Sequence, residues 1–200
     1  MKLSILICHL PGPYRDRETT NELIDNIVIQ CDEMNAIERD SCEVLYIGDN
    51  KSMSVGRKRN ILLDIAQGER VCFVDDDDKV SDDYVKKMLS YFVHDVDCVA
   101  IGVRYTQDGS NEKIYDYSYK KNINTRLVGV KTPVAGRMPN HLCLWKKQAA
   151  QRVRFPDRNL GEDHEWAEKQ LFTNYSLHIE PEIIYNYRFE RQKTQTRIKK

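Results

Sequence analysis

The stretch that decides the fold is a short apolar run that ends in four carboxylates: Val71-Cys72-Phe73-Val74-Asp75-Asp76-Asp77-Asp78. An almost wholly apolar run of this length is typical of a strand buried on both faces of a sheet. Four neighbouring carboxylates at its end repel one another, and a divalent cation with oxygen ligands would offset that repulsion. A solvated acidic loop that caps the next helix is the alternative. An EF-hand is excluded, because Val80 and Lys86 stand where its loop requires Gly and Glu.

The same strand-then-helix pattern recurs on both sides of this stretch. Apolar runs that predict strands occupy residues 3–10, 43–47, 70–74 and 97–105. Between them lie segments with apolar side chains at helical spacing, and two helix starts are predicted, at the capping box Thr19-Thr20-Asn21-Glu22 and at Ser81. Repeated strand–helix units predict parallel strands joined by right-handed crossovers in an open α/β sheet. Ligands of such sheets bind beyond the carboxyl ends of the strands.

The second half of the chain is less regular. Strands are expected at residues 114–120, 140–145 and 183–188, and a helix over 159–172. Tyr115, Tyr117 and Tyr119 share one face of the first of these strands, so they form either a stacking platform for a base or sugar or a half-buried edge strand. No repeat or Pro/Gly-rich linker divides the chain, and its length suits a single domain over residues 1–200.

Charge is balanced overall but uneven along the chain. Lys and Arg number 31 and Asp and Glu also number 31, so no net charge favours a nucleic-acid or membrane partner. Residues 1–100 carry 12 basic and 20 acidic side chains, whereas residues 101–200 carry 19 basic and 11 acidic. An acidic half followed by a basic half hints at a site where a cation and an anion meet.

Targeting and redox signals predict a cytoplasmic protein. No stretch approaches the run of about 18 apolar residues that a membrane span needs, and the first apolar run is too short for a signal peptide. The six cysteines form no CxxC pair, so we expect buried thiols in a reducing compartment. His94, His141 and His178 lack metal-ligand spacing and are expected to be structural, whereas His9 lies at the predicted ligand-binding edge.

A second acidic motif follows in the basic half, at Gly161-Glu162-Asp163. On a helix, Asp163 shares a face with Trp166, whereas Glu162 and Glu165 lie on the other side. An acid beside a tryptophan on the inward face of a helix is well placed to act as a general base in a cleft. An acid that only complements the helix dipole is the alternative.

Three motifs in this order resemble glycosyltransferases of the GT-A fold, in particular the inverting family 2 type. They are Gly56-Arg57-Lys58-Arg59-Asn60 with Ala66-Gln67-Gly68, then Phe73 to Asp78, then Gly161-Glu162-Asp163. The resemblance implies a Rossmann-like open sheet, mostly parallel, as in nucleotide-diphospho-sugar transferases. It also implies a nucleotide-sugar-binding half over residues 1–105 and a small irregular half over 106–200 that binds the acceptor and carries the base.

The resemblance also implies residue roles. Asp163 matches the catalytic base, and Asp77 the metal contact. Donor binding is implied for Asp49, which matches the acid that reads the base, for Arg59 near the nucleotide, for Asp75 near the ribose, and for Asp76. Arg188 and Arg191 are expected to neutralise the phosphates. One departure is Cys8-His9-Leu10-Pro11, where the family usually has Pro-Thr-Tyr-Asn.

The function implied is an inverting transfer of a hexose or pentose, dependent on Mn²⁺ or Mg²⁺, from a nucleoside diphosphate sugar. A uridine diphosphate (UDP) sugar is the expected donor. The acceptor is a glycan or, given the basic tail at residues 188–200, DNA with a hydroxylated base. Two alternatives stay open: a nucleotidyltransferase on a similar sheet, and a non-catalytic module that binds a nucleotide or sugar.

Overall fold

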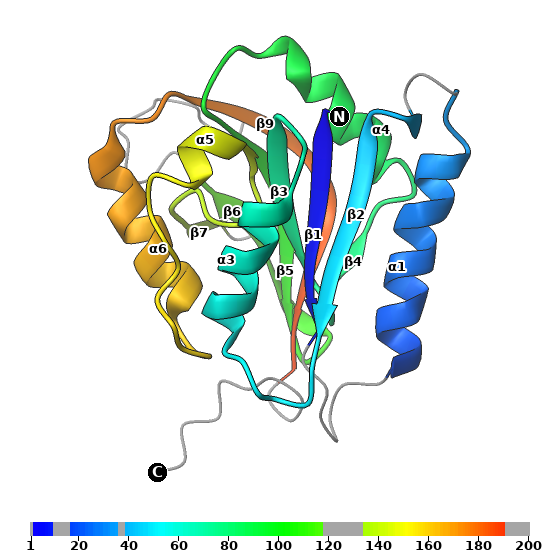
Figure 1. The fold of residues 1–200 in the computed structure, drawn as a ribbon, viewed down its shortest axis with the longest axis horizontal. Helices are drawn as coiled ribbons and strands as arrows, with labels where there is room; N and C mark the ends of the chain where they lie inside the picture. The colour runs from blue at the N-terminus through cyan, green and yellow to red at the C-terminus, as the bar shows by residue number, and fades with distance from the viewer. Residues whose placement is uncertain (1, 10–16, 36–38, 118–133, 191–200) are drawn as a thin grey trace.

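The structure, a computed structural model, describes residues 2–9, 17–35, 39–117 and 134–190. Within these residues the strands form one nine-stranded sheet. Its centre is parallel, as predicted, and consists of β1 (Leu3–His9), β2 (Cys42–Gly48) and β3 (Arg70–Asp75), with β1 between the other two. Their carboxyl ends meet at one edge of the sheet, at the bottom of Figure 1.

The strands beyond β3 run in mixed directions. The short strand β8 (Leu144–Lys146) lies antiparallel between β3 and β5 (Cys98–Gln107), so β5 runs in the same direction as β3. Next come β6 (Ser110–Asp116), antiparallel to β5, and β7 (Val134–Gly136), parallel to β6. The main strand order is therefore β2-β1-β3-β8-β5-β6-β7.

The last strand, β9 (Leu177–Phe189), crosses β5. Its first part pairs with the start of β5 on the edge opposite β8, and its later part lies between β5 and the two-residue strand β4 (Lys79–Val80). The pairing register shifts at Gly102, where an added Cβ would lie 2.2 Å from the carbonyl oxygen of Glu182. Only glycine allows this approach, and the crossing carries the end of β9 to the acidic end of β3.

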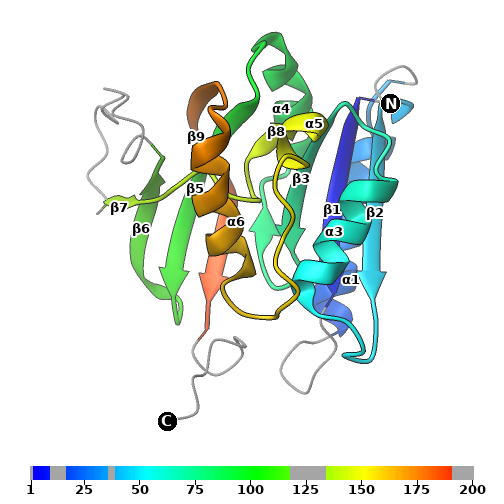
Figure 2. The same ribbon diagram turned by 60° about the vertical axis from the view of Figure 1, so that its left-hand side comes forward.

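Helices cover both faces of the sheet (Figure 2). One face carries α1 (Arg17–Asp32) and α4 (Tyr84–Ser90), which continues as the short 3-10 helix η1 (Tyr91–Val93). The other face carries α3 (Val55–Ile65) and α6 (Glu162–Gln170), which is followed by the 3-10 helix η2 (Leu171–Thr173). A single turn of helix, α5 (Lys147–Ala150), follows β8.

The core lies between these layers and the sheet. Leu3, Ile5, Leu6 and Ile7 of β1 are fully buried, as expected of a strand covered on both faces. All six cysteines are free, and four of them are buried. In the described part of the chain, no helix is long and apolar enough to cross a membrane.

Several element boundaries differ from the sequence predictions. Helix α1 begins at Arg17, so the predicted capping box lies inside it, and the Thr20 hydroxyl instead lies 3.3 Å from His9 Nδ1. The cap residue of α4 is Asp83, and Ser81 donates to its carboxylate. The strand expected at 140–145 is confined to β8. The helix expected from 159 begins only at Glu162, after Gly161 with a φ of 71°.

Candidate active site

The acidic stretch forms a tight turn beyond β3. The Asp78 N–H donates to the carbonyl oxygen of Asp75 at 3.1 Å. The Tyr185 hydroxyl, from β9, accepts from the Asp75 N–H and donates to the Asp78 carboxylate at 2.7 Å. Burial, then the charges of Asp75 and Asp77, raise the pKa of the Asp78 carboxyl well above its usual value. The turn thus gathers several carboxylates, and contacts from β9 fix its conformation.

Arg188 reaches the same turn from β9. Its backbone N–H donates to the Asp78 carboxylate at 2.8 Å, and its guanidinium donates twice to the carbonyl oxygen of Asp77, at 2.6 and 3.1 Å. The Arg188 guanidinium, which was predicted to neutralise the phosphates, therefore lies against the turn that carries Asp77. Arg191, the second such prediction, lies outside the described residues.

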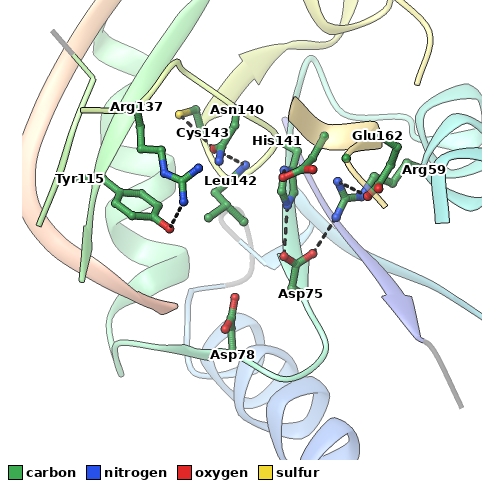
Figure 3. A network of polar contacts seen from close by, with 12 residues as sticks. Arg59, Asp75, Asp78, Tyr115, Arg137, Asn140, His141, Leu142, Cys143 and Glu162 are labelled. Carbon is green, nitrogen blue, oxygen red and sulfur yellow. Dashed lines mark hydrogen bonds and ion pairs between the residues drawn. The ribbon is translucent and has the colours of Figure 1, made fainter. Parts of the chain in front are cut away.

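Asp75 is the centre of a network of buried charges (Figure 3). One carboxylate oxygen accepts from Arg59 Nη2 at 2.9 Å, and Arg59 Nη1 lies 3.2 Å from Glu162 Oε1. The Arg59 guanidinium lies over the rings of Phe73 and Phe155, at 5.6 and 5.5 Å from their centroids. Burial works against the charge of Arg59, but Asp75 and Glu162 outweigh it and raise its pKa.

His141 lies between Asp75 and Asp163 and is within hydrogen-bond distance of the first only. Its Nε2 lies 3.2 Å from Asp75 Oδ2, its Nδ1 lies 3.9 Å from Asp163 Oδ2, and its side chain is only 3% exposed. The Asp163 carboxylate is 39% exposed. The end of β3 and the start of α6 therefore meet across one imidazole. Sequence reasoning missed His141, since nothing in its local spacing marks it.

The prediction for Glu162 was wrong. It was placed on the outer side of the helix with Glu165, but it is buried and paired with Arg59, and burial raises the pKa of its carboxyl. Glu165 does lie on the outer side of α6, where its carboxylate pairs with Lys169 at 2.7 Å. The reason for the error is the late start of α6. Glu162 is its first residue, where the chain comes from the loop and the 3.6-residue pattern does not yet fix orientation.

Asp49 lies beyond the end of β2. Its carboxylate accepts from the Ser52 hydroxyl and the Met53 N–H, and it forms an ion pair with the fully buried ammonium of Lys58. Desolvation opposes ionisation, but Lys58 and the Met53 N–H together hold the pKa of Asp49 well below its usual range. A cavity of about 670 Å³ opens beside Asp49, lined also by His9, Thr20, Asn21, Ile24, Asp25, Tyr46, Gly48 and Asn50.

Asp76, in the same turn, pairs with a histidine of β1. Its side chain is fully buried, and its Oδ2 lies 2.9 Å from His9 Nδ1. His9 itself lines the cavity beside Asp49. The predicted site residues thus lie in two regions, the acidic turn at 75–78 and the cavity beside Asp49. The contact between Asp76 and His9 links these two regions.

Tyr115 of β6 and Tyr117, just after it, pack in the interior of the sheet. Both interpretations of these tyrosines were wrong: β6 pairs with β5 and β7 and is not an edge strand, and exposed fractions of 5% and 2% leave no stacking platform. Tyr119 lies outside the described residues. The Tyr115 hydroxyl accepts from Arg137 at 3.2 Å (Figure 3).

Comparison with known proteins identifies the family and the fold. A sequence profile described as glycosyl transferase family 2 matches residues 18–154. Residues 1–349 of TarS from S. aureus, solved in complex with UDP, superpose with a TM-score of 0.68 at 17% identity, covering 94% of this chain and 60% of that one. The same TarS fragment in complex with UDP-GlcNAc gives a TM-score of 0.63 at 18% identity, covering 94% and 58%. No curated protein sequence matches.

At such identities the likeness to TarS shows the fold, and the chain spans about 60% of the length of these solved fragments. The profile match extends over more than half of the chain and includes the turn at 75–78 and His141. The protein therefore belongs to glycosyl transferase family 2 and has the GT-A fold.

Proposed function

We propose that the protein transfers a sugar from a nucleoside diphosphate sugar to an acceptor hydroxyl with inversion, and that Asp163 is the general base. The observation that carries this proposal is the position of His141, 3.2 Å from Asp75 and 3.9 Å from Asp163, because it shows that the acidic end of β3 and the Asp163 carboxylate lie on either side of one side chain. A displacement reaction needs a group that stabilises the leaving diphosphate and a base that activates the acceptor, on opposite sides of the bond that breaks.

The cavity beside Asp49 is the proposed nucleoside site. Its volume of about 670 Å³ is in the range usual for small-molecule sites. The TarS structures with UDP and UDP-GlcNAc share the fold, which supports a UDP sugar as donor. In this assignment Asp49 binds the base, and Asp75 and Arg59 hold the ribose side of the nucleotide. Asp76 contributes indirectly, because it holds His9 at the cavity wall.

The carboxylates of the turn suit a divalent cation. Oxygen ligands are those that Mg²⁺ and Mn²⁺ prefer, and such ions are often held by one or two carboxylates together with substrate phosphates. Asp75 is paired with Arg59 and His141, and Asp78 is buried, so we assign the half-buried Asp77 as the metal contact. When bound, Mn²⁺ or Mg²⁺ would neutralise negative charge on the diphosphate.

The proposed reaction is a single displacement at the anomeric carbon of the donor sugar. Asp163 accepts the proton of the acceptor hydroxyl as that oxygen forms a bond to the anomeric carbon. The bond from this carbon to the diphosphate oxygen breaks, and the leaving group departs as the nucleoside diphosphate. Arg188, which lies against the turn, is proposed to contact the developing negative charge.

Release of the leaving group tests the reaction class. The full chain would be incubated with a panel of nucleoside diphosphate sugars and Mn²⁺, and free nucleoside diphosphate would be measured. We expect slow release without acceptor for one donor. Release of pyrophosphate from a nucleoside triphosphate would instead indicate a nucleotidyltransferase, and binding without either product would indicate a non-catalytic module; each outcome would contradict the proposal.

The metal contact has its own test. Asp77→Ala is expected to weaken Mn²⁺-dependent donor binding, measured by calorimetry with and without Mn²⁺, and Asp82→Ala, an exposed acid outside the turn, serves as the control. Equal donor affinity with and without metal in both the wild type and Asp77→Ala would exclude the metal role.

A further inference from the structure

A cluster of two imidazoles and one carboxylate lies at the end of the sheet opposite the candidate active site. His94 follows η1, in the turn that leads into β5. His178 and Glu180 lie two residues apart on β9, so their side chains point to the same face. His178 is paired with Val99 near the amino end of β5, whereas the acidic turn follows the carboxyl end of β3 (Figure 1).

The three side chains converge on one point. His94 Nε2 lies 2.7 Å from Glu180 Oε1, and His178 Nε2 lies 3.1 Å from the same oxygen. The two imidazole rings are stacked, with centroids 3.7 Å apart and planes 19° apart. Within the described residues, this is the one group of three or more His, Cys, Asp or Glu whose ligand atoms all lie within 4.8 Å of one another.

The ligand types and the nitrogen–oxygen spacing suit a tetrahedral metal ion. Two imidazoles on one tetrahedral ion have ring centroids about 5 Å apart, so the stacked rings, 3.7 Å apart here, must turn apart when the ion binds. Zn²⁺ binds imidazole nitrogen and carboxylate oxygen at about 2.0–2.2 Å, so two ligands of one tetrahedral ion lie about 3.4 Å apart. The two nitrogen–oxygen separations in the cluster are within a few tenths of an ångström to 0.7 Å of that spacing. Three protein ligands leave the fourth position for water or another small ligand.

The cluster is held by its surroundings. The carbonyl oxygen of His94 accepts from the Arg70 guanidinium at 2.6 Å and from the Val96 N–H at 2.9 Å. On β9, His178 is paired with Val99 and Ile179 with Ala100, and Glu180 follows directly, where the pairing register shifts. The fold therefore brings the three side chains together before any ion binds, and binding needs only side-chain rotations, which lowers its entropic cost.

The local charge is compatible with a cation. Glu182 lies two residues after Glu180 on β9 and contributes a further negative charge. Lys87 offsets part of it, since it pairs with Glu182 at 2.6 Å and lies 3.9 Å from Asp83. Glu180 is paired with the two histidines.

We propose that His94, His178 and Glu180 bind a divalent transition-metal ion, with Zn²⁺ the best match to two nitrogen ligands and one oxygen ligand. The ion would join the turn after η1 to the start of β9, two segments far apart in the sequence. This site is separate from the proposed donor metal, which has oxygen ligands only, and it does not depend on the proposed function.

Metal titration of the full, chelator-treated chain tests the proposal. We expect one equivalent of Co²⁺ to bind with the visible absorption of a four-coordinate ion, and Zn²⁺ to displace it while excess Mg²⁺ does not. His94→Ala and His178→Ala should each lower Zn²⁺ affinity more than about tenfold. Glu180→Gln, which keeps a hydrogen-bond acceptor at the same position, should also weaken binding.

Two controls separate this site from the rest of the chain. His164→Ala removes an exposed histidine paired only with Glu168 in the described residues, and Asp77→Ala alters the donor site; both should bind Zn²⁺ as the wild type does. Circular dichroism of the metal-free variants checks that they fold. No Co²⁺ or Zn²⁺ binding by the wild type, or affinity unchanged in His94→Ala and His178→Ala, would overturn the proposal.

Discussion

His141 is the side chain on which the geometry of the candidate site depends. It is buried, its Nε2 contacts the Asp75 carboxylate, and its Nδ1 lies 3.9 Å from the Asp163 carboxylate. We propose that it acts as a positioning residue, which holds the base in line with the donor. A displacement of about 1 Å at such a site can cost on the order of 10²-fold in rate.

His141→Ala is therefore expected to lower kcat on the order of 10²-fold while donor KM changes much less. His141→Gln, which can still donate to Asp75, should recover part of the rate. Steady-state kinetics over a range of pH measures this split. A loss of thermal stability with unchanged kcat would show that His141 has only a structural role.

Arg59, which is buried, pairs with two carboxylates at once, the buried Glu162 and the partly buried Asp75. Removing one partner of a buried ion pair typically costs about 3–5 kcal/mol, because a charge is left uncompensated. Arg59→Met should cost about that much in the free energy of unfolding. Arg59→Met combined with Glu162→Gln should be less destabilised than Arg59→Met alone.

Urea denaturation measures both effects. The matched control is the pair Arg154–Asp64, which is about half exposed on each side, and Arg154→Met should cost no more than about 1 kcal/mol. If the double variant at Arg59 and Glu162 were less stable than the single variant, the charges would not be coupled as described.

At the scale of elements, α3 is placed by a close approach to the segment before α6. The Gly56 N–H donates to the carbonyl oxygen of Arg158 at 3.2 Å, and a Cβ at Gly56 would lie 1.9 Å from the carbonyl oxygen of Pro156. This contact explains the glycine that opens the motif at 56–60. It ties the helix that carries Arg59 to the segment that leads to Glu162 and Asp163.

Gly56→Ala should push these segments apart, at a cost of about 1–3 kcal/mol in stability and with a loss of transfer activity. Ile65→Ala, at an exposed position of the same helix, is the control and should change neither. Thermal unfolding measures the stability of both variants, and donor turnover measures their activity. Gly56→Ala with wild-type stability and turnover would mean that the close approach does not hold the site together.

The loop from β2 to α3 depends on the ionised form of Asp49. Its folded pKa lies below the unfolded value of about 3.9, so the stability it contributes is present above that pH and is lost as the pH falls through the folded pKa. Asp49→Asn should therefore be less stable than the wild type at pH 7. The difference in unfolding free energy, measured in urea from pH 7 to 3, should shrink below about pH 4. A difference that stayed constant over this range would contradict the prediction.

For the whole molecule, the sequence was sufficient where the signal is local. The parallel strands β1, β2 and β3, the helices between them, and the acidic edge follow from short apolar runs and the residues that end them. The insertion of β8 and the crossing of β9 over Gly102 were not predicted, because they depend on contacts between distant segments. The burial of Glu162 and the position of His141 between Asp75 and Asp163 were missed for the same reason.

The sheet thus separates two sites. Its carboxyl end carries the carboxylates, His141 and the cavity beside Asp49, where we place donor and base. Its amino end carries His94, His178 and Glu180. Since β9 contributes Arg188 and Tyr185 to the first site and His178 and Glu180 to the second, this one strand spans both ends of the molecule.

The most direct measurement compares donor binding with turnover in the wild type and Asp163→Asn. Donor affinity, measured by calorimetry with Mn²⁺, should be nearly the same in both proteins, because the variant keeps the size and position of the side chain. Turnover should fall about 10²- to 10⁴-fold, the usual contribution of a general base. Wild-type turnover in Asp163→Asn would remove this residue from the reaction and contradict the proposed mechanism.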